Sequence, residues 1–196
     1  DYNGWYDRLR CSWKFILDTQ MIAAMGHPGG GRNEICARTQ SRFSLFNLTF
    51  PADSQVVRIF DSILVSRLGD FEKEVQVLSS GIAVATLNVY KQMSSDFLAT
   101  PEKFHYLFNI RDVAKVVQGI LMAKSQVIDS PESMLRLWAH ECTRVFCDRL
   151  LRTKTADEGR FRDILGAKMQ ETFQKDWQTV MNDALDPKLG PVFTSL

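Results

Sequence analysis

The segment best suited to bind an anion through its backbone is a run of glycines in the first quarter of the chain. Gly29, Gly30 and Gly31 are followed by Arg32, and the amides of such a run can form a nest for an anion. The run lacks the lysine and hydroxyl residue that follow the glycines of a phosphate-binding P-loop, and its spacing is not GxGxxG. From these residues alone, a plain loop is the favoured interpretation.

Two arginines stand at unusual places. Arg42 directly precedes an apolar run, residues 43–50, and Arg111 opens a predicted helix, where the helix dipole disfavours a cation. Both positions suit a guanidinium that binds an anion elsewhere. The alternatives are a surface salt bridge for Arg42 and a pair with a nearby acid such as Glu102 for Arg111.

The histidines and cysteines offer weaker chemistry. His27, His105 and His140 each lack a companion at a convincing spacing. Cys142 and Cys147 follow His140 at offsets of two and five, which scatter the three side chains around a helix rather than gathering them for zinc. We predict no metal site, core cysteines, and a capped or exposed histidine. No Ser/His/Asp or paired-carboxylate arrangement suggests a self-contained hydrolase.

Composition narrows the classes further. The chain has 196 residues, 45% hydrophobic and 24% charged, with a formal charge of +1, which is typical of a globular protein and gives no field for nucleic acid. No apolar run approaches the roughly 20 residues that span a bilayer, and Asp1–Arg10 does not resemble a signal peptide. The start at Asp1 suggests a piece of something longer, and four dispersed cysteines suggest a reducing compartment.

The elements that must position these residues differ along the chain. Residues 1–51 have an α/β pattern, in which two short apolar runs, 20–25 and 43–50, are predicted as buried strands. So short a run as 20–25 is also compatible with a helix. The residues between them, 26–33, are predicted as a loop.

From Asp53 the apolar period becomes helical. We predict helices that begin at Asp53, near Glu72, after Asn109 and at Ser130, followed by a last amphipathic segment from Phe161 to Met181. The expected apolar faces of the four helices are Val56, Ile59, Phe60, Ile63 and Leu64; Val75, Leu78, Ile82, Val89 and Met93; Val113, Val116, Val117, Ile120 and Leu121; and Leu135, Trp138, Cys142, Val145 and Phe146.

Six short strings together resemble dynein heavy chains, and most closely the third AAA+ module of an axonemal, inner-arm heavy chain. The similarity extends from the first residue to about Arg152. The strings are Gly4-Trp-Tyr-Asp7, Ala23-Ala-Met-Gly-His-Pro-Gly-Gly-Gly-Arg-Asn33, Ser41-Arg-Phe43, Phe104-His-Tyr-Leu-Phe-Asn-Ile-Arg-Asp112, Gln118-Gly-Ile120 and Arg136-Leu-Trp-Ala-His-Glu141.

The resemblance implies an α/β fragment of a AAA+ P-loop module followed by an all-α lid, mostly helical. Residues 1–52 would be the C-terminal part of the large subdomain, 53–152 the lid, and 153–196 a helical extension toward the next module. In that fold residues 21–25 would be the fourth strand and residues 44–49 the fifth, and the first strand of the module would lie between them. Residues 21–25 and 44–49 would then lie parallel, unpaired with each other, and expose apolar side chains.

The resemblance also gives roles to residues. His27 is a possible first sensor, since Gly26 has no side chain for that role; otherwise the function is lost. Arg42 matches the arginine finger that acts on the neighbouring module, and we expect it to be exposed. Arg111 matches the second sensor, which contacts the module's own nucleotide from a helix start on the side that meets the α/β part.

The implied function is a part of a motor ring in which ATP binding and hydrolysis drive or regulate microtubule-based movement of cilia. ATP or ADP with Mg would bind the intact module but not this fragment, because the sequence holds no Walker A lysine and no acidic Walker B run. The fragment alone is therefore expected to be inactive.

The implied partners are the neighbouring AAA+ modules and, through the parent protein, microtubules and dynein intermediate and light chains, with no nucleic acid and no membrane. The implied location is the cytoplasm and cytoskeleton, in the axoneme of a cilium or flagellum. The alternative is a non-catalytic helical protein-interaction domain, in which Arg42 and Arg111 are ordinary surface residues.

Overall fold

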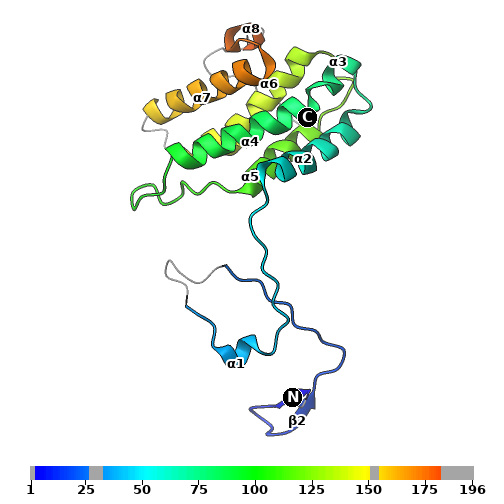
Figure 1. The fold of residues 1–196 in the computed structure, drawn as a ribbon, viewed down its shortest axis with the longest axis vertical. Helices are drawn as coiled ribbons and strands as arrows, with labels where there is room; N and C mark the ends of the chain where they lie inside the picture. The colour runs from blue at the N-terminus through cyan, green and yellow to red at the C-terminus, as the bar shows by residue number, and fades with distance from the viewer. Residues whose placement is uncertain (1–2, 27–32, 151–154, 182–196) are drawn as a thin grey trace. The chain divides into compact units, whose positions relative to one another are not determined.

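The chain forms two separate units. A computed structural model describes residues 3–26, 33–150 and 155–181. By its contacts the chain divides into Asp1–Thr49 and Phe50–Leu196 (Figure 1).

The first unit contains a short hairpin. Strands β1 (Gly4–Tyr6) and β2 (Trp13–Phe15) pair antiparallel. A Cβ atom at Gly4 would lie 2.7 Å from the Trp13 ring and 2.3 Å from the Lys14 carbonyl oxygen, so only glycine fits there. The unit also holds one helical turn, α1 (Ala37–Gln40).

The predicted strands over 20–25 and 43–50 are wrong for this chain. Both segments lack regular secondary structure, and no ladder joins them to each other or to any other described residue. A strand exists only where a neighbour takes up its backbone hydrogen bonds, and the hairpin does not extend to either segment. Apart from the half-buried Phe43, their large apolar side chains are exposed, as the resemblance implied; these are Met21, Ile22, Met25, Leu45, Phe46, Leu48 and Phe50.

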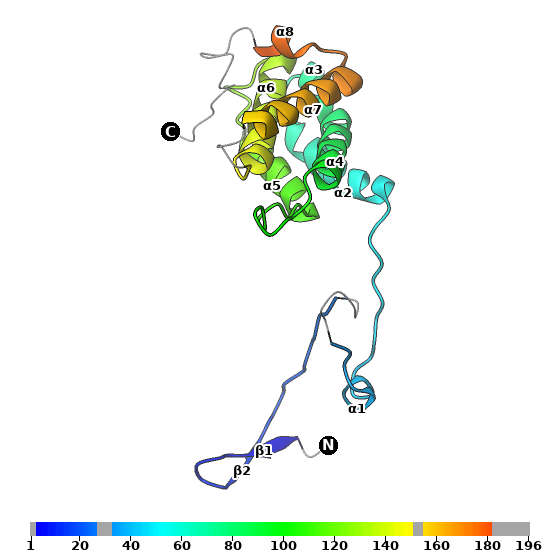
Figure 2. The same cartoon turned by 90° about the vertical axis from the view of Figure 1, so that its left-hand side faces the viewer.

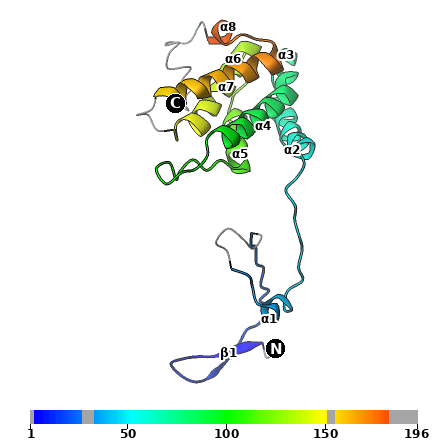
Figure 3. The same cartoon turned by 60° about the vertical axis from the view of Figure 1, so that its left-hand side comes forward.

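The second unit is a helical bundle around one central helix, α4. In Figures 1, 2 and 3, α4 lies between α2 and α7, and it also contacts α5 and α6, while α8 packs on α6. The elements are α2 (Asp53–Leu68), α3 (Lys73–Gln76), α4 (Leu78–Asp96), α5 (Ile110–Leu121), α6 (Pro131–Cys142), the π-helical turn η1 (Thr143–Cys147), α7 (Thr155–Phe173) and α8 (Trp177–Met181).

Most of the predicted helices are confirmed. The helices at Asp53, after Asn109 and at Ser130 begin where expected, the last with Pro131 in its first turn. The helix predicted from Glu72 into Gln92 is wrong in one respect, because it divides at Val77 into α3 and α4 and continues to Asp96. The described part of the segment predicted as an extension, 155–181, packs against the bundle through α7 and α8.

The buried face of α2 differs from the predicted one. Ile59 and Ile63 are 56% and 42% exposed, whereas Val56, Leu64 and Leu68 are buried. A helix that contacts its neighbours on one side buries only that stripe, and apolar residues just beside it remain in water. The apolar faces of the other three helices are buried or half-buried as predicted.

The middle of the core contains a polar contact between α4 and α6. The indole of Trp138, fully buried, donates a hydrogen bond of 2.9 Å to the hydroxyl of Thr86, which in turn donates to the Ile82 carbonyl oxygen at 2.6 Å. The ring of Phe173, in α7, meets the Trp138 ring edge-on at 5.6 Å. Three helices are therefore fixed around one indole.

Replacing Thr86 with valine keeps the size of the side chain but leaves the buried indole N–H without its acceptor. The free energy of unfolding should fall by about 1–3 kcal/mol, measured by urea denaturation. Thr86→Ser keeps the hydroxyl and loses one methyl group, so its cost should stay near 0.8 kcal/mol. Equal losses in the two variants would contradict the importance of the hydrogen bond.

Candidate functional site

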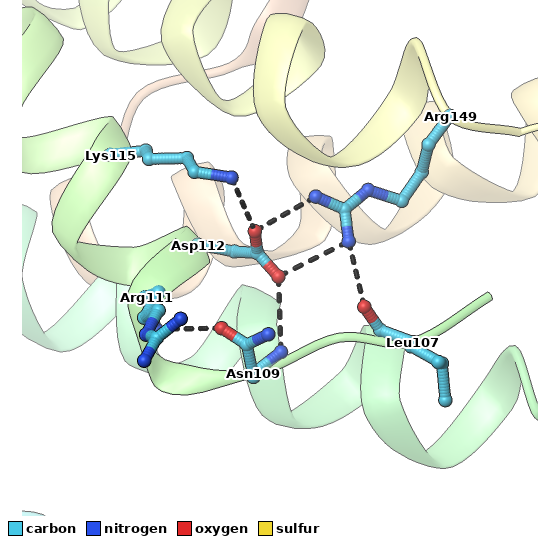
Figure 4. A network of polar contacts seen from close by, with 6 residues as sticks. All are labelled: Leu107, Asn109, Arg111, Asp112, Lys115 and Arg149. Carbon is cyan, nitrogen blue, oxygen red and sulfur yellow. Dashed lines mark hydrogen bonds and ion pairs between the residues drawn. The ribbon is translucent and has the colours of Figure 1, made fainter. Parts of the chain in front are cut away.

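The start of α5 is closed by a reciprocal cap. The side chain of Asn109 accepts a hydrogen bond of 2.9 Å from the backbone amide of Arg111, and the carboxylate of Asp112 accepts one of 3.0 Å from the amide of Asn109. Such a capping box satisfies amides that have no partner inside the helix. It also fixes the backbone on which Arg111 sits (Figure 4).

The Asp112 carboxylate is also one half of a buried ion pair. Its side chain is 2% exposed, and Arg149, beyond the end of η1, donates to both of its oxygens, at 2.8 and 3.2 Å (Figure 4). The same guanidinium donates to the Leu107 carbonyl oxygen at 2.8 Å and lies 5.1 Å from the centre of the Phe108 ring. One arginine thus contacts both the start of α5 and the loop that leads into it.

The environment of Asp112 favours its ionised form. Burial raises the pKa of this carboxyl, but the hydrogen bonds from Arg149 and from the Asn109 amide, together with the charge of Arg149, outweigh burial and lower the pKa below its ordinary value. At neutral pH the carboxylate is therefore a negative charge at the positive end of α5.

Arg111, the predicted second sensor, is the second residue of α5 and is exposed. Its backbone amide is taken up by Asn109. The guanidinium makes no hydrogen bond or ion pair within residues 3–26, 33–150 and 155–181. The alternative of a pair with Glu102 is therefore not observed.

The other two predicted site residues belong to the first unit. Arg42 is exposed, as expected, in the turn that follows α1, and its amide donates to the Thr39 carbonyl oxygen at 3.1 Å. His27, together with the glycine run, lies outside the described residues. The structure thus places Arg111 beside the cap and the ion pair of the second unit, whereas Arg42 belongs to the first unit.

A second polar cluster holds the loop before α5. Asp157, at the start of α7, accepts hydrogen bonds from Lys103 at 2.6 Å and from the buried Tyr106 at 2.9 Å. The hydrogen bond to Asp157 raises the pKa of Lys103. This cluster and Arg149 were missed in the sequence, where only the spacing from Asn109 to Asp112 was a readable signal of the cap.

Of the remaining candidates, the cysteines of α6 and η1 lie in or against the core. Cys142 is buried, and burial raises its thiol pKa well above the ordinary value, so the prediction of core cysteines is confirmed for Cys142, whereas Cys147 is half-buried against the core. Among the described residues, no group of three His, Cys, Asp or Glu side chains is placed to hold a metal ion. In the same part of the chain, no helix combines the length and the apolar character needed to cross a bilayer.

Comparison with known proteins places the two units. Residues 1–51 match the model of the P-loop containing dynein motor region, and residues 82–183 match that of the AAA+ lid domain. Dynein axonemal heavy chain 2 of Mus musculus is 46% identical over 190 residues, which are 97% of this chain and 4% of the relative. The chain belongs to the dynein heavy chain family.

A second relative from a distant organism agrees. The Dynein-1-beta heavy chain of the flagellar inner arm I1 complex of Chlamydomonas reinhardtii is 42% identical over 194 residues, 99% of this chain and 4% of that protein. This dynein chain therefore spans about 4% of the length of the curated relatives it matches. Its helical bundle is a AAA+ lid, and the resemblance to axonemal dyneins is confirmed.

The ion pair makes the stability of this dynein lid depend on pH. The folded pKa of Asp112 lies below its unfolded value of about 4, so the ionised carboxylate stabilises the fold above about pH 4, and this contribution is lost as the pH falls through the folded pKa. Asp112→Asn should lower the free energy of unfolding by about 3 kcal/mol at pH 7. The difference between variant and wild type should shrink below about pH 4.

Urea denaturation of both proteins at a series of pH values measures this difference. The exposed Asp70, changed to Asn, is the matched control and should cost less than about 0.5 kcal/mol at each pH. A difference between Asp112→Asn and wild type that stays constant from pH 7 to pH 3 would show that the ionised pair does not stabilise the fold.

Proposed function

We propose that this chain supplies the lid, and part of the preceding large subdomain, of a AAA+ module in an axonemal dynein motor ring, where it helps to bind ATP. The observation that carries the proposal is the start of α5, where Arg111 is exposed on a backbone fixed by the capping box and the Asp112–Arg149 pair. The finer assignment to the third module rests on the resemblance of the sequence motifs.

Arg111 is proposed as the second sensor. A guanidinium donates in two parallel hydrogen bonds to phosphate oxygens, and it gains most where its own position is already fixed. The cap fixes that position, because the backbone from Asn109 to Asp112 is tied at both ends. Closure of the lid on the module's own nucleotide would bring this donor to the phosphates and transmit the nucleotide state through the ring.

Arg42 is proposed as the arginine finger that reaches the nucleotide of the neighbouring module. It is exposed in a turn and directly precedes the apolar segment 43–50. A planar, permanently charged donor at such a place suits the charge that develops on a transferred phosphoryl group. His27 remains a possible first sensor on the strength of the resemblance alone.

The implied cofactor is ATP or ADP with Mg, which supplies the phosphoryl group and the bound cation. The described residues fit a supporting role: Arg111 and Arg42 are exposed cations suited to phosphate oxygens, while the sequence contains no Walker A lysine. The residues of this chain would thus sense and orient the nucleotide rather than cradle it. The proposed partners are the adjacent modules of the same heavy chain and, through the whole motor, microtubules and the intermediate and light chains of an axoneme.

Arg111→Ala should weaken ATP binding at this module in the intact heavy chain. Loss of one charged hydrogen bond, about 1.5–3 kcal/mol, corresponds to a roughly 10- to 150-fold higher ATP concentration for half-saturation. The local measurement is the protection of peptides within residues 104–121 from hydrogen exchange as ATP is added. Arg58→Ala, an exposed arginine of α2, is the control, and an unchanged ATP dependence in Arg111→Ala would refute the sensor role.

Arg42→Lys keeps the charge but loses the two-pronged donor. In the intact ring, half-protection of the preceding module from hydrogen exchange should then need about tenfold more ATP. Arg38→Lys, another exposed arginine four positions earlier, should leave that concentration unchanged. Equal behaviour of the two variants would show that Arg42 is an ordinary surface residue.

A further inference from the structure

We propose that Arg149 is a positioning residue for nucleotide binding, which holds Arg111 in its working place through Asp112. The inference rests on the proposed sensor role of Arg111 and adds to it the residue that keeps the sensor ordered. Arg149 lies 38 positions after Arg111 in the sequence numbering, and nothing in the sequence pattern connects the two.

The contacts of Arg149 converge on the helix start that bears Arg111. Its guanidinium binds both oxygens of Asp112, at 2.8 and 3.2 Å, and the Leu107 carbonyl oxygen at 2.8 Å. It therefore joins the residue directly after Arg111 to the loop four residues before it. Figure 4 shows the guanidinium of Arg149 facing the Asp112 carboxylate and the Leu107 carbonyl oxygen, with Asn109 on the far side of the carboxylate.

The constraint passes to Arg111 through the backbone. Asp112, once held by Arg149, accepts the Asn109 amide, and Asn109 in turn accepts the Arg111 amide. Each of these bonds removes freedom from the same four residues. A donor held on a fixed backbone reaches its ligand with less loss of entropy, whereas a displacement of about 1 Å can cost roughly 100-fold in function.

An irregular helical turn lies just before Arg149. After α6 the helix widens into the π-helical η1, whose last hydrogen bond joins the Asp148 amide to the Thr143 carbonyl oxygen at 3.1 Å. A π turn contains one more residue per hydrogen-bonded ring than an α turn and so changes the direction of the side chains that follow it; such turns are frequent at functional sites. Here η1 packs on α5. Arg149 lies two residues after the end of η1.

A purely structural purpose explains this arrangement less well. A buried ion pair is weak evidence for stability, because apolar residues of similar size often stabilise a fold as much. What the fork provides is geometry, since a bidentate arginine fixes both the position and the plane of the carboxylate. That geometry is useful at a place where an adjacent side chain must meet a ligand.

The test uses the intact heavy chain and a cycle of variants. Arg149→Met is made alone and together with Arg111→Ala, and Arg149→Lys keeps one charged donor without the fork. The first readout is the ATP concentration that half-protects peptides within 104–121 from hydrogen exchange. The second is the thermal unfolding of the module without ATP.

The matched control is Arg136→Met. Arg136, in α6, also donates to a carbonyl oxygen, that of Val180 in α8, at 2.5 Å. In Figure 1, α8 lies at the top of the bundle, whereas the loop into α5 lies at the bottom. This variant therefore removes a comparable arginine contact away from the proposed site.

The expected result is an increase of roughly tenfold or more in the half-protecting ATP concentration for Arg149→Met, with a smaller increase for Arg149→Lys. In the Arg111→Ala background the same change should have less than about a twofold effect, because the residue being positioned is gone. Arg136→Met should change thermal unfolding without changing the ATP dependence.

Three results would overturn the inference: an unchanged ATP dependence in Arg149→Met and Arg149→Lys, an equal effect with and without Arg111, or the same effect from Arg136→Met. If Arg149→Met fails to fold, Arg149→Lys carries the same comparison. Failure of the proposed function is a different outcome, in which Arg111→Ala alone leaves ATP binding unchanged.

Discussion

A single carboxylate, that of Asp112, satisfies three demands at the start of α5. It caps the helix, it neutralises the guanidinium of Arg149, and its negative charge interacts favourably with the positive end of the helix dipole. Removing such a charge from water is costly unless every lone pair finds a donor. The side chain is buried, and each oxygen accepts at least two hydrogen bonds or ion contacts, from Arg149, Lys115 and the Asn109 amide. The placement of Arg111 depends on this one charge being satisfied.

Several motif residues that carry the family resemblance pack inside the lid. At Gly119 an added Cβ atom would lie 1.9 Å from the Glu141 carboxylate, so a side chain at position 119 would displace Glu141 from its place between α5 and α6. Glu141 is buried and accepts from Arg144 at 2.5 Å. Trp138 donates one neutral hydrogen bond to Thr86 in the same core. The motifs therefore include residues that pack the interior of the lid as well as residues proposed to bind nucleotide.

The helices were predictable because their apolar period and their caps are local properties, readable from Asn109 and Ser130 onward. The strands were not, because residues 20–25 and 43–50 have the right composition but pairing depends on a neighbour, which composition does not supply. Ile59 and Ile63 were misplaced for a similar reason, since the period identifies a stripe and only packing decides its edges. The positions of Arg42 and Arg111 were readable as chemical oddities, whereas the pairing of Asp112 with Arg149 joins distant segments and could come only from the fold.

The loop between α4 and α5 is held from two directions. Arg149 holds the loop at Leu107 from the end of η1, and Asp157 holds it at Lys103 and Tyr106 from the start of α7. Moving the loop away from either anchor would break charged hydrogen bonds made by Arg149, Lys103 and Asp157. A displacement of the start of α5 therefore acts on Arg149, just beyond η1, and on the start of α7 together. Helix α7 is thus joined to the loop that precedes Arg111 by the Lys103–Asp157 salt bridge as well as through the apolar core.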